Sequence, residues 1–355
     1  MASSEEFENA ANDGQTEFAD FGLEDKSLLG RFQHALHTTP ALVPLIVLIF
    51  AIALFGILLG SKFFSPFALT LILQQVQIVG VLAAAQTLII LTAGIDLSVG
   101  AIAVFCTVIM GQFSFRYGIP APISVGIGLA VGTALGAISG WLVSRVKLPP
   151  FIVTLGMWQI VLAANYLYSA NETIRSQDIA ADAPFLQFLG TKLTFGGATF
   201  TLGVVLMVAL VIVLAYALRS TAWGRHVYAV GDDPEAAELA GVDVHRTLMS
   251  VYMLAGFICA LAAWVMIGRF SSVSPSASTG VVGNIQAITA VVIGGISLFG
   301  GRGSIVGAFF GALIVGVFEL GLRMAGADPQ WTFMLIGMLI IGAVTVDQWI
   351  RKVSG

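Results

Sequence analysis

Charge is scarce in this chain of 355 residues. Sixteen lysines and arginines and twenty aspartates and glutamates make up 10% of the residues, whereas soluble proteins carry about 25%. Hydrophobic residues make up 57% of the chain, and its mean hydropathy is +0.95. These values exclude an ordinary soluble domain and predict an integral membrane protein.

Patterns for disulfides, nucleotides and catalysis are also missing. The two cysteines, Cys106 and Cys259, lie in apolar stretches and predict no disulfide framework. None of the five lysines follows a glycine, so the chain has no phosphate-binding Gly-Lys-Ser/Thr loop. The four histidines lie in polar segments without metal-ligand spacing. We therefore expect no catalytic residue, metal or cofactor, which argues against a membrane enzyme.

What the chain has instead is a series of long, uncharged, apolar stretches. A helix needs about 20 such residues to cross a bilayer, and these stretches lack the alternation of a membrane β-barrel. The sequence therefore predicts an all-α polytopic bundle of about ten transmembrane helices. The predicted spans are 42–60, 69–91, 96–115, 121–143, 150–170, 199–218, 248–267, 284–300, 304–322 and 330–347.

The first part of the chain has a different composition. Eight acidic residues stand against a single lysine in the first 30 positions. This predicts a disordered acidic tail over residues 1–37, followed by a transmembrane domain over residues 38–355. The tail has no basic start or apolar core, so it is not a cleaved secretory signal.

The distribution of basic residues predicts the orientation. With a cytoplasmic tail and ten alternating spans, ten lysines and arginines fall inside and six outside, as the positive-inside rule requires. Both termini would then be cytoplasmic. Two long outside loops are expected, at about 171–198 and 268–283.

Glycines recur four residues apart in two predicted spans, at Gly132, Gly136 and Gly140 and at Gly303, Gly307 and Gly311. This spacing lets helix backbones approach closely in a membrane. Packing within one subunit is the favoured interpretation, and a dimer seam is the alternative.

A charged loop over residues 219–247 interrupts the apolar pattern. Beyond residue 40 the chain carries 26 formal charges, and eight of them lie between Arg219 and Arg246. Asp233, Pro234 and Glu235 form a helix start and Gly241 a helix stop, which predicts a short helix over 234–240. It is either an ordinary connector or, as the caps at both ends favour, a docking element. The residues assigned to this docking helix are Asp233, Pro234, Glu235, Ala236, Ala237, Glu238, Leu239 and Gly241.

Few ionisable groups lie within the predicted spans. Glu319 is well inside one, and we expect it to pair with Arg323, four residues on. Asp96 is expected to act as a helix cap beside Ser98. One carboxylate is a thin basis for a proton relay, so an ion-coupled secondary sugar transporter is the disfavoured alternative. Neutral polar side chains and one tryptophan are candidates for a translocation path: Gln74, Gln75, Gln77, Gln86, Trp158, Gln159, Asn165, Asn284 and Gln286.

Four motifs in order resemble the permease subunits of bacterial ABC sugar importers, the ribose, xylose, arabinose, galactose and fructose branch. They are GIDLSVGAI at 94–102, KLPPFIVTLGM at 147–157, WGRHVYAVGDDPEAAELAGVDV at 223–244 and GGISLFGGRGSIVGAFFGALIVG at 294–316. The resemblance extends over nearly the whole chain from about residue 40 and is closest to fructose-type permeases. The acidic tail has no counterpart in it.

This resemblance implies a permease fold in the bacterial inner membrane and a homodimer that encloses a path for a monosaccharide. It also implies a separate cytoplasmic ATPase and a periplasmic sugar-binding protein. The loop at 231–246 would be the coupling helix that docks on the ATPase. Membrane lipid would surround the bundle, and nothing in the sequence predicts a nucleic-acid partner.

Overall fold

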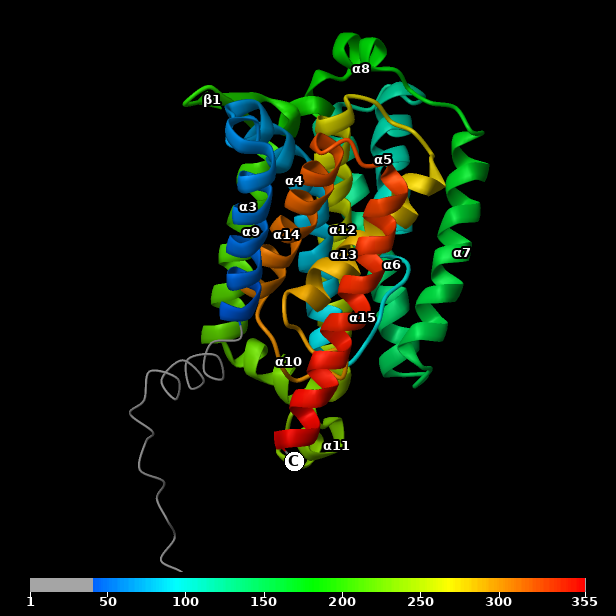
Figure 1. Cartoon of the computed structure of the whole chain (residues 1–355). Coiled ribbons are helices and arrows are strands. Elements are labelled where there is room, and N and C mark those ends of the chain that lie inside the picture. Colours follow the sequence, from blue (N-terminus) through cyan, green and yellow to red (C-terminus); the bar gives the residue numbers. More distant parts are fainter. Residues whose placement is uncertain (1–40, 355) are drawn as a thin grey trace, which may run out of the picture. The chain divides into compact units, whose positions relative to one another are not determined.

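The structure is a computed structural model that describes residues 41–354. The expected acidic tail, residues 1–37, lies outside the described residues. Everything below therefore concerns the helical unit that begins after the tail (Figure 1).

Ten apolar helices follow one another in this unit (Figure 1). They are α3 (Leu42–Leu59), α4 (Pro66–Leu91), α5 (Val99–Phe115), α6 (Ala121–Ser144), α7 (Pro150–Ser169), α9 (Leu202–Ser220), α12 (Val244–Phe270), α13 (Ala277–Ile293), α14 (Ile305–Met324) and α15 (Pro329–Ser354). Seven are long and apolar enough to cross a membrane, while α5, α13 and α15 carry shorter apolar segments. The helices match the ten predicted spans in order, which confirms a polytopic helical fold.

One predicted span has the wrong bounds. The eighth was expected at 284–300, but α13 ends at Ile293. The chain then turns through Gly295, Gly300 and Gly301, whose φ angles are 76°, 82° and 70°. Glycine adopts this left-handed region without steric cost, so the chain leaves the helix there despite its apolar composition. The long loop expected at 268–283 is correspondingly short, because α12 ends at Phe270 and α13 begins at Ala277.

The expected long loop between α7 and α9 contains ordered elements at one end of the bundle, which we call the hairpin end (Figure 1). These are α8 (Ser176–Asp182), the 3₁₀ helix η2 (Pro184–Gly190) and an antiparallel hairpin of β1 (Lys192–Phe195) and β2 (Ala198–Thr201). Gly196 and Gly197, both with positive φ, form its two-residue turn. A shorter 3₁₀ helix, η1 (Gly60–Lys62), joins α3 to α4.

The core is built around α4 and α12. Every residue of α4 from Val79 to Leu91 is buried, and α12 is the most deeply buried of the seven long helices. α12 packs along α6, where Gly132 and Gly136 face the backbone of Tyr252 and Gly256. The first glycine series therefore packs within one subunit, as the favoured interpretation predicted.

The second glycine series is only partly helical. Gly307 and Gly311 lie on α14 against the backbone of Gly294 and Ala290 at the end of α13. Gly303 precedes α14 and has φ 130°, so placing it on the same helix was wrong. Gly303 allows the chain to turn before α14, whereas Gly307 and Gly311 let α14 approach the end of α13 closely.

The α6–α12 contact can be tested by adding one methyl group. A Cβ at Gly136 would overlap the backbone oxygen of Tyr252, whereas a Cβ at Gly126 on the same helix meets no atom within 4 Å. We expect Gly136→Ala to destabilise the fold by about 1–3 kcal/mol and Gly126→Ala to leave it unchanged. The stability is measured as the temperature at which detergent-purified protein loses its monodisperse peak. Equal temperatures for the two variants would contradict the close α6–α12 packing.

Candidate functional site

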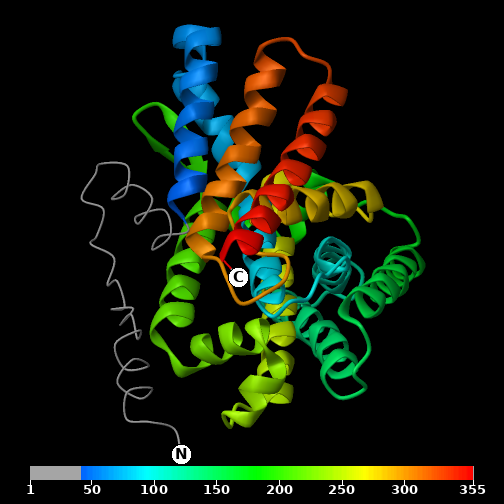
Figure 2. The same cartoon turned by 60° about the horizontal axis from the view of Figure 1, so that its bottom comes forward.

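The charged loop forms two helices at the end of the bundle opposite the hairpin (Figures 1 and 2). The first, α10 (Ala222–Asp232), was not predicted. Val227 and Val230 on it are buried, while Arg225 and His226, directly before Val227, are exposed. This apolar spacing is a helical signal, but it spans only 11 residues among charged neighbours. The sequence therefore did not predict a helix in this segment.

The second helix, α11 (Pro234–Leu239), is the predicted docking helix with one residue fewer at its end. The Asp233 carboxylate accepts hydrogen bonds from the backbone N–H groups of Glu235 at 2.9 Å and Ala236 at 3.0 Å. Gly241 follows with φ 85°. Both predicted caps are thus confirmed, and they satisfy backbone groups that a short helix leaves unpaired.

The exposure of α11 is one-sided. Ala237 is 5% exposed because it faces the bundle, so it does not belong to the outward surface as the sequence suggested. Glu235 and Glu238 are exposed, and Leu239 is 91% exposed. Leu239 follows the two exposed carboxylates on the same ordered helix, so this end of α11 presents charged and apolar groups together to the outside.

α10 is held against the end of α4 and against the turn that precedes α14. The backbone of Gly231 lies against Leu91 at the end of α4 and against Gly301, and Gly301 N–H donates to the Leu91 carbonyl at 3.0 Å. The Tyr228 hydroxyl donates to the Gly303 carbonyl at 2.9 Å. Burial raises the pKa of this hydroxyl, so it remains a donor. We call Leu91, Gly231 and Gly301 the glycine junction, and it connects the α10–α11 surface directly to the core.

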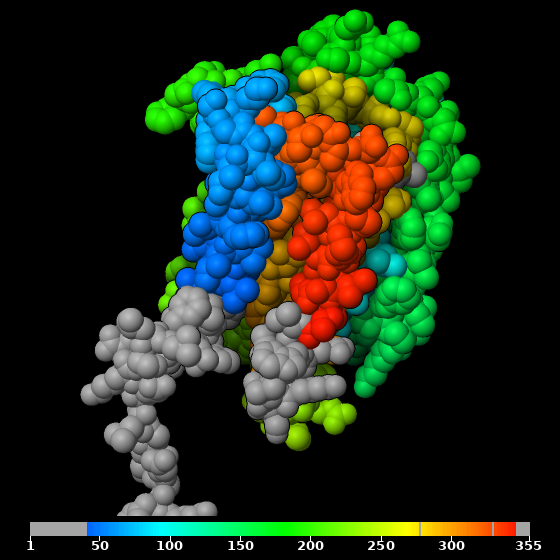
Figure 3. Space-filling view, viewed as in Figure 1, coloured from blue at the N-terminus to red at the C-terminus, as the bar shows by residue number. Residues whose placement is uncertain are grey.

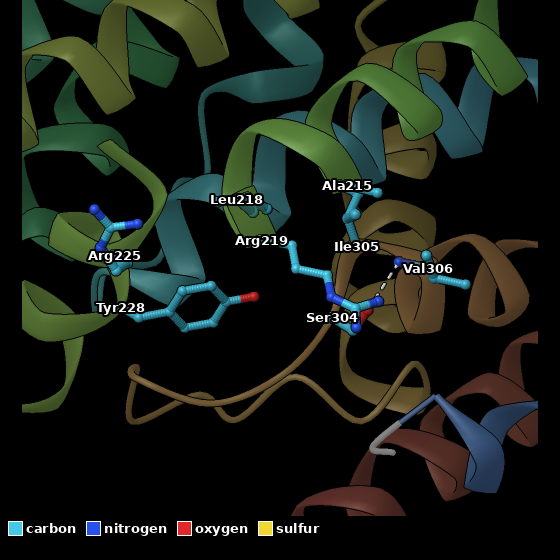
Figure 4. A pocket seen from close by; sticks show the side chains of 8 residues that line it. All are labelled: Ala215, Leu218, Arg219, Arg225, Tyr228, Ser304, Ile305 and Val306. Carbon is cyan, nitrogen blue, oxygen red and sulfur yellow. Dashed lines mark hydrogen bonds between the residues drawn. The ribbon is translucent and has the colours of Figure 1, made fainter. Parts of the chain in front are cut away.

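A cavity of about 500 Å³ opens beside α10. Figure 4 shows Arg219 from α9 lying beside Ser304, with Arg225 and Tyr228 of α10 across the opening. The Ser304 hydroxyl accepts from the N–H of Val306 at 3.2 Å and caps α14. The basic side chains come from α9 and α10, and the exposed carboxylates come from α11, so this end of the bundle carries both charge signs.

Three of the predicted path residues each bond to a different segment outside the helices. The Gln77 amide oxygen accepts from Thr201 at 2.6 Å, and Asn165 donates to the Pro275 carbonyl at 2.9 Å. Asn284 donates to the Leu97 carbonyl at 3.0 Å. These side chains join neighbouring segments, and the structure does not bring them together.

The remaining path candidates on α4 and α7 also lie apart. With its amide group turned, Gln86 pairs with the backbone N–H and C=O of Asp96 at 3.3 and 3.1 Å. The carbonyl of Gln74 accepts from the Gln77 amide at 3.2 Å. Trp158 is half-buried and Gln159 is exposed on α7.

Two path candidates do converge, on Glu319 of α14. The Glu319 Oε2 atom accepts from Gln75 of α4 at 3.0 Å and from Gln286 of α13 at 3.1 Å. Its Oε1 atom accepts from Arg323 at 2.9 Å, which confirms the predicted ion pair. Three helices therefore meet at one carboxylate inside the bundle.

Asp96 is not the helix cap that we expected, because the N-cap of α5 is Ser98, but its carboxylate stabilises the turn before that helix. Its Oδ1 atom accepts from both the N–H and the hydroxyl of Ser98 at 2.6 Å, directly before α5 begins at Val99. The side chain is buried, so the carboxylate stabilises the turn and does not face an open path.

Comparison with known proteins identifies the family to which this chain belongs. Residues 68–344 match a family profile described as "Branched-chain amino acid transport system / permease component". The chain belongs to this permease family.

Several relatives of this permease are named as import proteins. The chain is 66% identical to the fructose import permease protein FrcC of Rhizobium meliloti, over 99% of this chain and 97% of the relative. It is 33% identical to the ribose import permease protein RbsC of Escherichia coli K12, over 86% and 92% of the two chains. Identity to the galactose/methyl galactoside import permease protein MglC of Haemophilus influenzae is 29%, over 78% and 84%. No solved structure matches the chain.

The cap of the docking helix gives a local prediction. Replacing Asp233 with alanine removes two hydrogen bonds to the first turn, and such a loss costs about 1 kcal/mol. We expect backbone amides of 235–240 to exchange hydrogen roughly fivefold faster in Asp233→Ala. Asp233→Asn keeps an accepting oxygen and serves as the control. Unchanged exchange in the alanine variant would show that the flanks alone hold α11.

Proposed function

We propose that this permease is the transmembrane subunit of an ATP-driven importer that carries a monosaccharide inward across the bacterial inner membrane. Fructose is the first candidate substrate, because the relative with 66% identity is named for fructose import and matches nearly end to end. Relatives named for ribose and galactose support the wider sugar class.

The source of energy follows from what the chain lacks. It has no phosphate-binding loop of the Gly-Lys-Ser/Thr type, so a separate ATPase subunit would hydrolyse ATP and this chain would carry out no catalysis. The orientation proposed from the basic residues places both termini and the α10–α11 surface in the cytoplasm, where such a subunit would bind.

The observation that carries this proposal is the form of α11. It has six residues, too few for a helix to persist alone in water, yet it is capped at its start and exposes Leu239 with Glu235 and Glu238 beside it. An ATPase groove with an apolar pocket and basic rim would fit this surface. We therefore assign Asp233–Leu239 and Gly241 to coupling.

The glycine junction supplies a route from that surface to the helices. When the ATPase closes, a displacement of α10 would press on the end of α4 through Leu91 and on the turn before α14 through Gly301. Packed backbones transmit displacement because no flexible side chain lies between them. A second copy of the chain would complete the path, and rocking of the two bundles would alternate its access.

At the other end, the ordered α8, η2 and hairpin would receive the periplasmic sugar-binding protein (Figure 1). The hairpin exposes Phe195 at its turn. We propose that neutral polar side chains line a path through the bundle. Gln75 and Gln286 are the best supported, because both donate to Glu319.

The alternative, an ion-coupled carrier, would need a carboxylate that gains and loses a proton. Glu319 is the best placed, but its carboxylate is already engaged by Arg323 and two amide donors, and one carboxylate is a thin basis for a proton relay. ATP-driven uptake is favoured for this reason. Uptake that stops with an uncoupler while cellular ATP is held constant would instead support the carrier.

Reversing the charge of the docking helix tests the coupling proposal. We expect Glu235→Lys with Glu238→Lys, and separately Leu239→Asp, to reduce co-purification of the ATPase and sugar-stimulated ATP hydrolysis at least tenfold. The reason is that each change opposes a charge or an apolar contact at the centre of the interface.

Phe195→Asp is the matched control, since it also places a charge on an open apolar residue but at the hairpin end. Co-purification should remain at the wild-type level in this variant. If the α11 variants retain both the ATPase and its stimulation, α11 is not the coupling element.

A further inference from the structure

A second cavity lies between α13, α14 and α15, remote in sequence from the docking helix. Its volume of about 360 Å³ falls at the lower end of the range of about 300–1,000 Å³ that small-molecule sites occupy. Figure 3 shows α14 in orange and α15 in red side by side on the face of the bundle turned to the viewer. The space is large enough for one small ligand.

The walls of this cavity are apolar, with polar groups gathered at one place. Ile285, Phe333 and Ile336 supply apolar surface, and Gln286, Glu319 and Arg323 supply the polar groups. A mainly apolar pocket with a few convergent polar side chains is the usual form of a site that orients a small molecule.

The polar groups offer both acceptors and donors. The Glu319 side chain is 15% exposed and that of Arg323 is 68% exposed. The carboxylate accepts three hydrogen bonds from Gln75, Gln286 and Arg323, and it has about four acceptor positions. A guanidinium carries five N–H donors, and Arg323 uses one of them in the ion pair. The pair has no net charge, so it suits a neutral ligand rich in hydroxyl groups.

A purely structural role for these groups would look different. The Gln77–Thr201 hydrogen bond joins α4 to β2, and Gln77 is 1% exposed. Gln286 and Glu319 instead reach the wall of an open cavity. Ionisable side chains inside membrane spans are energetically costly and usually mark a functional site. Helix packing alone therefore does not explain an ion pair at this position.

We propose that this cavity holds a neutral polyol, a monosaccharide, during its passage. The Glu319 carboxylate accepts from a sugar hydroxyl, Arg323 and Gln286 donate to sugar oxygens, and Phe333 covers an apolar face of the ring. This rests on the proposed function, and it gives Glu319 a role beyond pairing with Arg323. Gln75 positions the carboxylate from the side of α4.

The test measures uptake of radiolabelled fructose by cells that produce this chain with its ATPase and binding protein, per amount of chain in the membrane. We expect Glu319→Gln and Gln286→Ala each to lower the initial rate about tenfold, as the loss of one good hydrogen bond does. ATP hydrolysis stimulated by the loaded binding protein should persist, because the docking helix is untouched. If Glu319→Gln does not reach the membrane, the initial uptake rates of two other variants decide the test. These are Gln286→Ala and the neutral double variant Glu319→Gln with Arg323→Gln.

Thr154→Val is the matched control, since it removes a buried side-chain hydrogen bond, from the Thr154 hydroxyl to the Ile95 carbonyl at 3.0 Å, outside this cavity. We expect it to keep uptake within about twofold of the wild type. The proposal is overturned if Gln286→Ala transports at the wild-type rate, or if Thr154→Val lowers uptake as much. Failure of the proposed function is seen separately, in the wild type, as uptake that is independent of ATP.

Discussion

The bundle depends on direct contact between helix backbones. Lipid tails are as apolar as the side chains, so burial alone does not drive one helix against another in a membrane. Gly132 and Gly136 on α6 let the backbone of α12 approach, and α12 in turn contacts α4, α5 and α6. Without those glycines α12 would be held away from its neighbours, and the groups beyond it would lose their positions.

The same close approach connects the core to water. Gly231 brings α10 against Leu91 and Gly301, while Asp233 starts α11 directly after α10. α11 begins three residues after Gly231, whose contacts reach the end of α4 and the turn before α14. Under the proposed function, a partner bound to α11 would act on the transmembrane helices through these backbone contacts. This geometry underlies the proposal that ATP hydrolysis in another subunit drives transport.

Prediction from the sequence worked where the signal was local. The ten helices were predictable because each is an apolar run of sufficient length, and α11 because its caps are neighbouring residues. The eighth span was misplaced because glycines with positive φ ended α13 inside an apolar stretch. α10 was missed because it is short and lies among charges, and its helical form depends on burying Val227 and Val230 against the bundle.

By itself the sequence determined the membrane environment, the ten apolar helices, the capped helix and the absence of a nucleotide-binding loop. Each of these depends on residues close together in the chain. Only the tertiary structure decided which polar side chains meet. Gln75 and Glu319 are 244 residues apart yet share a hydrogen bond, while Gln77, two residues from Gln75, contacts Thr201. Such pairings depend on how the helices are rotated and packed against each other, and hydropathy does not encode that.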